Sequence, residues 1–399
     1  MSTAGKRNRT MNRSRVLRTI WRQSLVSRIE TAHLLGLDKS TVSSLVNELI
    51  ETGLIQEVAQ GDASRQGGRR PVMLQINRDY GSVLGMELQP GFFRAALCDL
   101  HGRVIRSWSE KRGSEDIDFT EFLLGTIHSI LDDLGDTRSS LMGIGVAMGG
   151  LVNSIGNEIA GSIPMGLSQY DFQREISDRV EVPVVAENDA NACAWGELTF
   201  HRYEEVHDFL YVLVQMREAE CGRHLYGGIG VGIGVVINGT LYPGANFTSG
   251  EFRSVFWDGQ SSGQFSLTDD EAARVYTDEG LRKKFFRELA KNVALIINVM
   301  NLDHLFIGGD FLNSGAELEA ILHEEIQQNW PYDSPVKCDI RFSSFGENAV
   351  VYGAAGMMLE RLFSDQIFPL GDIRNRHGRD EVLSDFNEGI LSRGGSGER

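Results

Sequence analysis

The sequence predicts an α/β protein that begins with a winged helix-turn-helix and continues into a two-lobed body. In the first 78 residues, three helical patterns precede two strand-like runs, and in the rest a β-β-β-α-β pattern occurs twice. The charge is uneven too: residues 1–78 hold 13 Lys or Arg against 6 Asp or Glu, whereas residues 79–399 hold 26 against 49. A basic head on an acidic body indicates that only the head binds a polyanion.

The bulk composition is that of a globular protein. The chain has 399 residues, 41% of them hydrophobic and 24% charged, which suits two or three domains. No apolar run is long enough to cross a bilayer, and no apolar core follows the basic N-terminus as in a secretory signal. The four cysteines are far apart and form no paired motif. We therefore expect a cytoplasmic protein without membrane contact.

The head begins with two helical patterns. Apolar residues recur at helical spacing over residues 12–24, which predicts a first helix. Ser27 and Glu30 form a capping box that opens a short second helix with an apolar set of Ile29, Ala32, Leu34 and Leu35, ending at Gly36.

The third helix is predicted from Asp38, a good N-cap, to about Thr52, before Gly53. Val42, Leu45, Val46, Leu49 and Ile50 form its apolar stripe. Small hydroxyls, an amide and one cation on the other side suit a helix in the major groove, because they approach base edges without bulk. The alternative is a solvated helix face, which is more often rich in paired Glu and Lys. The candidate DNA-binding residues are Lys39, Ser40, Thr41, Ser43, Ser44 and Asn47.

Two alternating runs, 54–58 and 72–76, follow the third helix and predict strands. The segment between them is rich in glycine and arginine, which predicts a wing whose tip lies along DNA phosphates or in a minor groove. Arg65, Arg69 and Arg70 are its candidate DNA-binding residues.

The body starts with three strand-like runs, 82–88, 92–99 and 103–109, then a helix over 118–134 and a strand over 141–147 that leads into Gly149 and Gly150. A second set begins with strands at 209–215 and 229–237. Later come helices near 281–300, 314–329 and 346–361 and strands near 304–308 and 338–343. Two such halves imply two lobes with a ligand-binding cleft between them.

Polar and glycine-rich stretches mark the strand ends. Residues 187–192, Glu-Asn-Asp-Ala-Asn-Ala, end a strand and open a helix, and their carboxylates and amides could hold sugar hydroxyls or simply cap the helix. The glycines of 228–234 and 308–309 allow close approach of a phosphate, but packing and turns are an equally good explanation.

Together, in this order, these stretches resemble the ROK family of repressors, open reading frames and kinases. The resemblance covers nearly the whole chain. It rests in the head on 40–43, 51–55 and 67–71, and in the body on 187–191 with 196–197, 230–234 with 238–241, 250–251 and 307–309. It implies an actin-like, two-lobed sugar-kinase fold of the ribonuclease H-like type.

The resemblance also implies a domain division. Residues 1–78 are expected to bind DNA. Residues 79–370 are expected to bind an effector and to oligomerise, with lobes at about 79–200 and 201–370. Residues 371–399 are expected to be a loosely ordered tail. The candidate sugar-binding residues are Gly149, Gly150, Asn188, Asp189 and Glu251.

Departures from the family pattern favour a regulator over an enzyme. Kinases of the family carry Asp-x-Gly-Gly-Thr after the first body strand, whereas Glu87-Leu88-Gln89-Pro90-Gly91 stands here. Proline removes a backbone donor and glutamine adds bulk where phosphate must come close. Asp189 matches the kinase base, but without a positioned phosphate we expect no catalytic residue and no cofactor.

The zinc ligands of the family are also replaced. Ser254 stands where the family has a histidine, and no cysteine lies between Cys221 and Cys338. Zinc needs several thiolate or imidazole ligands, so no metal is expected. Ser254 and the altered segment 257–268 put the usual sugar contacts in doubt, and the apparent insertion 217–226 has no assigned role.

The sequence thus predicts a transcription regulator, most simply a repressor of carbohydrate genes. Its expected partners are operator DNA, a sugar or sugar derivative, and copies of itself in a homodimer or homotetramer. Such a protein would be associated with the nucleoid when bound to DNA. The alternatives are an ATP-dependent sugar kinase with a DNA-binding head, which a coupled ADP-release assay would detect, and a DNA-binding protein whose body only oligomerises.

Overall fold

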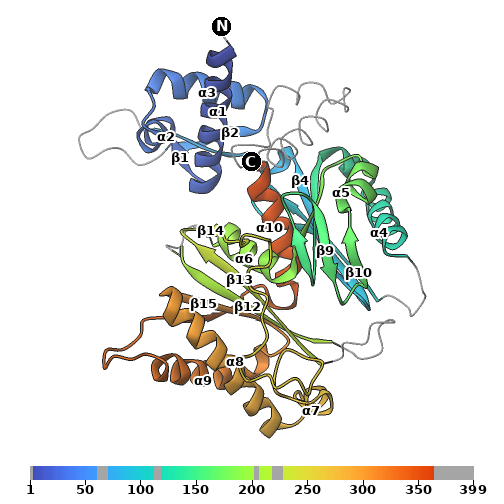
Figure 1. Ribbon diagram of the computed structural model, residues 1–399. Coiled ribbons are helices and arrows are strands. Elements are labelled where there is room, and N and C mark those ends of the chain that lie inside the picture. Colours follow the sequence, from blue (N-terminus) through green and yellow to red (C-terminus); the bar gives the residue numbers. More distant parts are fainter. Residues whose placement is uncertain (1–2, 61–70, 112–117, 202–205, 218–227, 364–399) are drawn as a thin grey trace, which may run out of the picture.

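The computed structural model describes residues 3–60, 71–111, 118–201, 206–217 and 228–363. The predicted wing arginines Arg65, Arg69 and Arg70, most of the 217–226 insertion and the 371–399 tail lie outside these residues. Figure 1 shows a small helical head above a larger body of β-sheets with helices around them. The fold class predicted from the sequence is confirmed.

The head contains three helices and a three-stranded antiparallel sheet of order β1-β3-β2. The elements are α1 (Thr3–Gln23), β1 (Val26–Ser27), α2 (Arg28–Leu35), α3 (Lys39–Glu51), β2 (Ile55–Gln60) and β3 (Val72–Ile76). The capping box of Ser27 and Glu30 is present, and Gly36 ends α2 in the left-handed conformation.

Two expectations for the head were wrong in detail. Helix α1 begins at Thr3, nine residues before the predicted start, because the polar segment Lys6–Arg9 continues the helix ahead of the apolar stripe. Ile29 and Leu34 are 58% and 56% exposed, so the apolar set of α2 does not face the core as a whole. In this eight-residue helix the core-facing side consists of Thr31 and Ala32, which are buried, and Leu35, which packs against the core from a partly buried position.

The two body sheets have the same strand order. The first is β11-β7-β4-β5-β6 and the second β16-β15-β12-β13-β14. In each, three strands are joined antiparallel and the other two are added parallel. The strands are β4 (Ser82–Gln89), β5 (Phe92–Asp99), β6 (Val104–Lys111), β7 (Leu141–Met148), β11 (Val184–Asn188), β12 (Phe209–Arg217), β13 (Gly228–Ile237), β14 (Thr240–Leu241), β15 (His304–Gly309) and β16 (Asp339–Phe342). The repeated order confirms the two predicted halves.

Helices cover the sheets and join the halves. The longer ones are α4 (Phe119–Leu134), α6 (Asp189–Phe200), α8 (Glu279–Met300), α9 (Gly315–Gln328) and α10 (Ala349–Phe363), and the short ones α5 (Phe172–Glu175) and α7 (Asp269–Arg274). The last described helix, α10, returns to the first sheet, where a Cβ at Gly85 or Gly145 would lie 2.2 Å from a carbonyl oxygen of α10. Helix α10 therefore packs directly on that sheet.

A third body sheet was not predicted. Strands β8 (Leu151–Asn153), β9 (Glu158–Ser162) and β10 (Leu167–Tyr170) form it in the order β10-β9-β8. They are three to five residues long, and only Val152, Ile159 and Ser162 are buried, so no apolar alternation marks them in the sequence.

The head and the first lobe share one apolar core. Trp21 of α1 stacks on Phe363 of α10 with ring centroids 4.9 Å apart, and both side chains are buried. His101 of the body also contacts the backbone carbonyl oxygen of Ile76 in the head at 2.7 Å. The head is thus packed on the body. Within the described ranges, no helix has the length and apolar character needed to span a bilayer.

Candidate functional site: a cavity between the lobes

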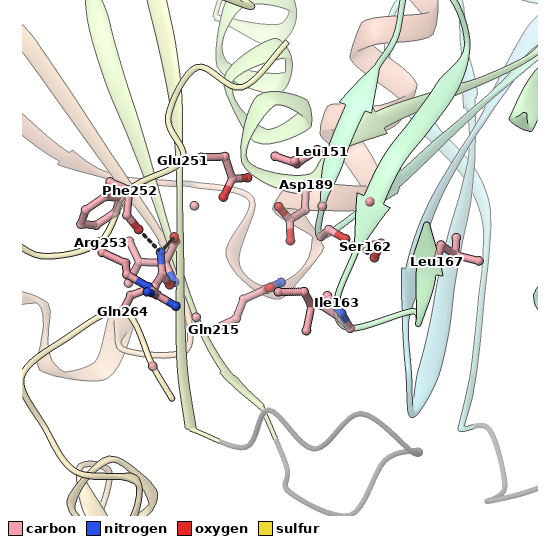
Figure 2. Close-up of a pocket in the computed structure, with 18 of the residues that line it drawn as sticks. Leu151, Ser162, Ile163, Leu167, Asp189, Gln215, Glu251, Phe252, Arg253 and Gln264 are labelled. Carbon is pink, nitrogen blue, oxygen red and sulfur yellow. Dashed lines mark hydrogen bonds between the residues drawn. The ribbon is translucent and has the colours of Figure 1, made fainter. Parts of the chain in front are cut away.

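A cavity of about 770 Å³ lies between the two lobes. Its first wall comes from β8–β10 and the start of α6, and its second from β12, β13 and the segment 251–264 (Figure 2). This volume is within the usual range for small-molecule sites. Of the predicted sugar-binding residues, Gly149, Gly150, Asp189 and Glu251 line the cavity.

Asp189 is the first residue of α6 and only 4% exposed. One carboxylate oxygen accepts a hydrogen bond from the backbone N–H of Ala190 at 2.8 Å. The Asp189 and Glu251 carboxylates both point into the space between the lobes (Figure 2). Two carboxylates on opposite walls can accept hydrogen bonds from several hydroxyl groups of one ligand.

Asn188 lies beside the cavity but does not line it. Its side-chain oxygen caps α6 by accepting hydrogen bonds from the backbone of Ala190 and Asn191, and its amide donates to the Gly150 carbonyl at 3.0 Å. The amide thus holds the glycine floor against α6. The structure gives Asn188 a positioning role, and its direct contact with a ligand stays a prediction.

The glycines around the cavity allow close packing. Gly150 has φ +142°, and a Cβ there would lie 2.5 Å from the Gly161 carbonyl oxygen. On β13, Cβ atoms at Gly232 and Gly234 would lie 2.8–2.9 Å from atoms of Ala190 and Ala194 in α6. The sequence left two explanations for the glycines of 228–234, close approach of a phosphate and close packing. The structure supports packing for Gly232 and Gly234.

Several lining residues were not predicted. Gln264 lies on the second wall, held by hydrogen bonds to the backbone of Val231 and Phe252. The guanidinium of Arg253 lies 4.1 Å above the ring of Trp257, and so a cation is fixed at the cavity wall. Gln264 belongs to the altered segment 257–268 and Arg253 directly precedes Ser254, and these two departures from the family pattern were the only signal in the sequence.

Glu87 lies at the end of β4, where the kinase pattern breaks. It is 2% exposed, and burial raises the pKa of its carboxyl to about 7, against the opposing effects of Gln89 and Arg94. The carboxylates of Asp189 and Asp310 add to this rise. Arg94 is 3.7 Å from Glu87 and is bound more closely to Glu347, at 2.9 Å. The region is therefore acidic, and its nearby cation is already paired.

Hydrogen bonds hold the segment around Ser254. Ser254 is buried and accepts from the side chain of Asn292 at 3.0 Å, while Glu288 accepts from the hydroxyl of Ser266 at 2.5 Å. In the part of the chain that the structure describes, no group of three or more His, Cys, Asp or Glu could hold a metal ion. The expectation that no metal is bound stays a prediction.

We expect purified protein to contain no stoichiometric zinc, because residue 254 is a serine, whose hydroxyl accepts a hydrogen bond from Asn292, and no cysteine lies between Cys221 and Cys338. Incubation with EDTA should leave the melting temperature unchanged, whereas loss of structural zinc would unfold a segment that depends on it. Elemental analysis and thermal denaturation check this. About one zinc per chain, lost together with folded structure on chelation, would contradict it.

In the head, the predicted DNA-binding side chains of α3 lie on its outer face or at its edge. Lys39, Ser40, Ser44 and Asn47 are exposed, and Thr41 and Ser43 are half-buried. Arginines that the sequence analysis did not select flank this face. Arg9 of α1 donates to the Ser44 hydroxyl at 3.1 Å and pairs with Glu48. Arg28 of α2 donates to Asn47 at 2.9 Å and pairs with Glu57.

These findings agree with comparisons with known proteins. Residues 84–253 match the ROK family model. The chain is 29% identical over 313 residues to the xylose repressor of Bacillus subtilis, covering 76% of this chain and 77% of that protein. It is 32% identical over 242 residues to the xylose repressor of Bacillus spizizenii, and 24% identical over 248 residues to the DNA-binding transcriptional dual regulator NagC of Escherichia coli. These two matches cover 60% and 61% of this chain but only 59% and 57% of the relatives.

Two solved structures share the fold. A ROK family transcriptional regulator, a homologue of the Escherichia coli MLC protein, superposes with a TM-score of 0.69 at 21% identity, over 96% of this chain and all of that one. A ROK family glucokinase from Streptomyces griseus, solved with glucose and AMPPNP, gives 0.52 at 18% identity, over 69% of this chain and 99% of that one.

Proposed function

The chain contains a ROK family domain, and from this premise we propose that it is a sugar-responsive transcription regulator, most simply a repressor of carbohydrate genes. One observation carries the proposal: a cavity with two carboxylates lies in a body on which a basic head is firmly packed. Relatives named xylose repressor and DNA-binding regulator support it. Residues 1–78 would bind DNA, and residues 79–370 would bind the effector and oligomerise.

The head would place α3 in the major groove of operator DNA and the wing along the backbone. Ser44 and Asn47 would reach base edges after exchanging their bonds with Arg9 and Arg28, whose guanidinium groups are then close to phosphates. A homodimer or homotetramer in the cytoplasm would present two heads to an inverted repeat.

The body would bind a sugar without phosphorylating it. Asp189 and Glu251 would accept hydrogen bonds from hydroxyl groups, and Gly149 and Gly150 would form the floor. A triphosphate would enter a region that already holds Glu87, Asp189 and Asp310 and whose Arg94 is bound to Glu347. Added negative charge is unfavourable there unless cations neutralise it, which argues against phosphoryl transfer.

The test is a titration of operator affinity against a sugar panel. The panel should contain pentoses, hexoses and N-acetyl sugars. Sugar acids are included because the Arg253 guanidinium at the cavity wall could pair with a carboxylate. We expect one sugar to weaken operator binding roughly 5- to 150-fold, the usual size of such coupling. Operator DNA must weaken the binding of that sugar by the same factor.

In this titration Asp189→Asn should blunt the response and leave sugar-free operator binding intact, because it removes a ligand-facing charge far from α3. Asp132→Asn serves as the matched control, since Asp132 is exposed on α4 and does not line the cavity. If a sugar binds tightly and operator affinity never changes, the body is not a switch for repression.

A further inference from the structure

Two adjacent residues at the end of α10 contact different parts of the molecule. Glu360 is only 9% exposed and accepts hydrogen bonds from Arg18 at 2.8 Å and Arg22 at 3.0 Å, both on α1 of the head. These ion pairs and the Trp21–Phe363 stack attach α1 to α10. The position of α1 therefore follows that of the last turn of α10.

Arg361 contacts the side of the body that forms the cavity. It donates to the backbone carbonyl of Ser154 at 2.7 Å, in the turn between β8 and β9. Strands β8 and β9 contribute Leu151, Gly161 and Ser162 to the cavity wall. Any movement of this wall on ligand binding would therefore displace a hydrogen-bond partner of α10.

Arg361 is also electrostatically coupled to Glu187, the buried residue just before Asn188 and Asp189. Burial raises the pKa of the Glu187 carboxyl, and the charge of Arg361 opposes that rise. Burial likewise lowers the pKa of Arg361, and Glu187 opposes that change. Glu187 in turn accepts hydrogen bonds from the backbone of Asn188 and the side chain of Asn191 in α6. The start of α6, which presents Asp189 to the cavity, thus shares a buried charge network with α10.

We propose that the last turn of α10 couples the cavity to the head, with Arg361 linked to the cavity wall and Glu360 linked to α1. Consecutive residues of a helix point about 100° apart, so one rigid turn holds both sets of contacts. A small rotation or shift of that turn changes both at once. A cavity of about 80 Å³ lies at the same junction and is lined by residues that include Trp21, Arg22 and Glu360. The packing between α1 and α10 is therefore incomplete, which leaves room for movement. The proposal rests on the proposed function, because it gives the route by which a bound sugar would reach the DNA-binding head.

The test uses hydrogen exchange of the full-length protein, without sugar or DNA. Removing Arg361 would leave Glu187 buried without its counter-charge, and the protein could fail to fold. Glu360→Gln keeps the shape of the side chain and removes its charge. Compared with the wild type, Glu360→Gln should show faster exchange in α1. It should also show exchange that is faster by roughly two- to tenfold in β8–β9 and at the start of α6. The matched control, Glu324→Gln, breaks the surface pair with Arg287 on the second lobe and should change only α8 and α9.

A second variant probes the opposite direction. Asn153 accepts a hydrogen bond from the backbone N–H of Gly156 and so holds the turn that carries the Ser154 carbonyl. Asn153→Ala should speed exchange in the last turn of α10 and in α1, because coupling between two sites is reciprocal. If the effects of both variants stay within their own elements, the proposal is overturned. The sugar titration is a separate measurement, so its failure would count against the proposed function and leave the exchange result unchanged.

Discussion

Replacement of Gly353 by valine is expected to destabilise the body by about 3 kcal/mol or more, through overpacking against backbone atoms. Gly353 lies where α10 crosses α6, and a Cβ there would be 2.0 Å from the Ala192 carbonyl oxygen. At the same helix crossing, a Cβ at Gly196 of α6 would lie 3.2 Å from the Gly353 Cα. Backbone atoms cannot move aside as a flexible side chain can, so the two helices must separate.

Urea denaturation followed by circular dichroism measures this effect. Gly125→Ala is the control, because a Cβ at Gly125 in α4 would meet no atom within 4 Å, and alanine should stabilise that helix by about 0.5–1 kcal/mol. A Gly353→Val variant with the midpoint of the wild type would show that α6 and α10 do not cross as closely as described.

Replacing both Arg69 and Arg70 by alanine is expected to weaken operator binding roughly tenfold or more, because two phosphate contacts are lost from the proposed wing. The loss should be similar for all DNA sequences, and the slope of log affinity against log salt should fall by about two. Binding titrations at several salt concentrations check this. Asn47→Ala should behave differently and change which sequence is preferred, since base contacts carry specificity.

The control is a double variant of two body arginines, Arg138→Ala and Arg174→Ala, which changes the net charge equally. Their partners are the exposed or half-buried carboxylates of Glu181 and Glu175, so little stability should be lost. If the Arg69/Arg70 variant binds operator DNA as the wild type does at moderate salt, the wing assignment is wrong.

Short-range patterns were sufficient for much of the fold. The capping box of Ser27 and Glu30, the end of α2 at Gly36, and the strands β3 and β5 are all as predicted, because each depends on residues close in sequence. The repeated strand pattern also indicated the two halves of the body. The start of α1 and the β8–β10 sheet were missed, since their residues carry no apolar periodicity.

The sequence by itself determined most of the longer helices and strands, which carboxylate and amide side chains are candidates for binding hydroxyl groups, and where the kinase pattern breaks. Only the tertiary structure decided how these residues are used. In the folded protein, Asn188 caps α6 and supports Gly150. Arg253 and Gln264 line the cavity. Glu360 binds Arg18 and Arg22, which are more than 330 positions away in the sequence. The physical reason is that helix caps and amphipathic periodicity depend on neighbouring residues. Ion pairs and cavity walls depend instead on distances that exist only after the sheets and helices have packed.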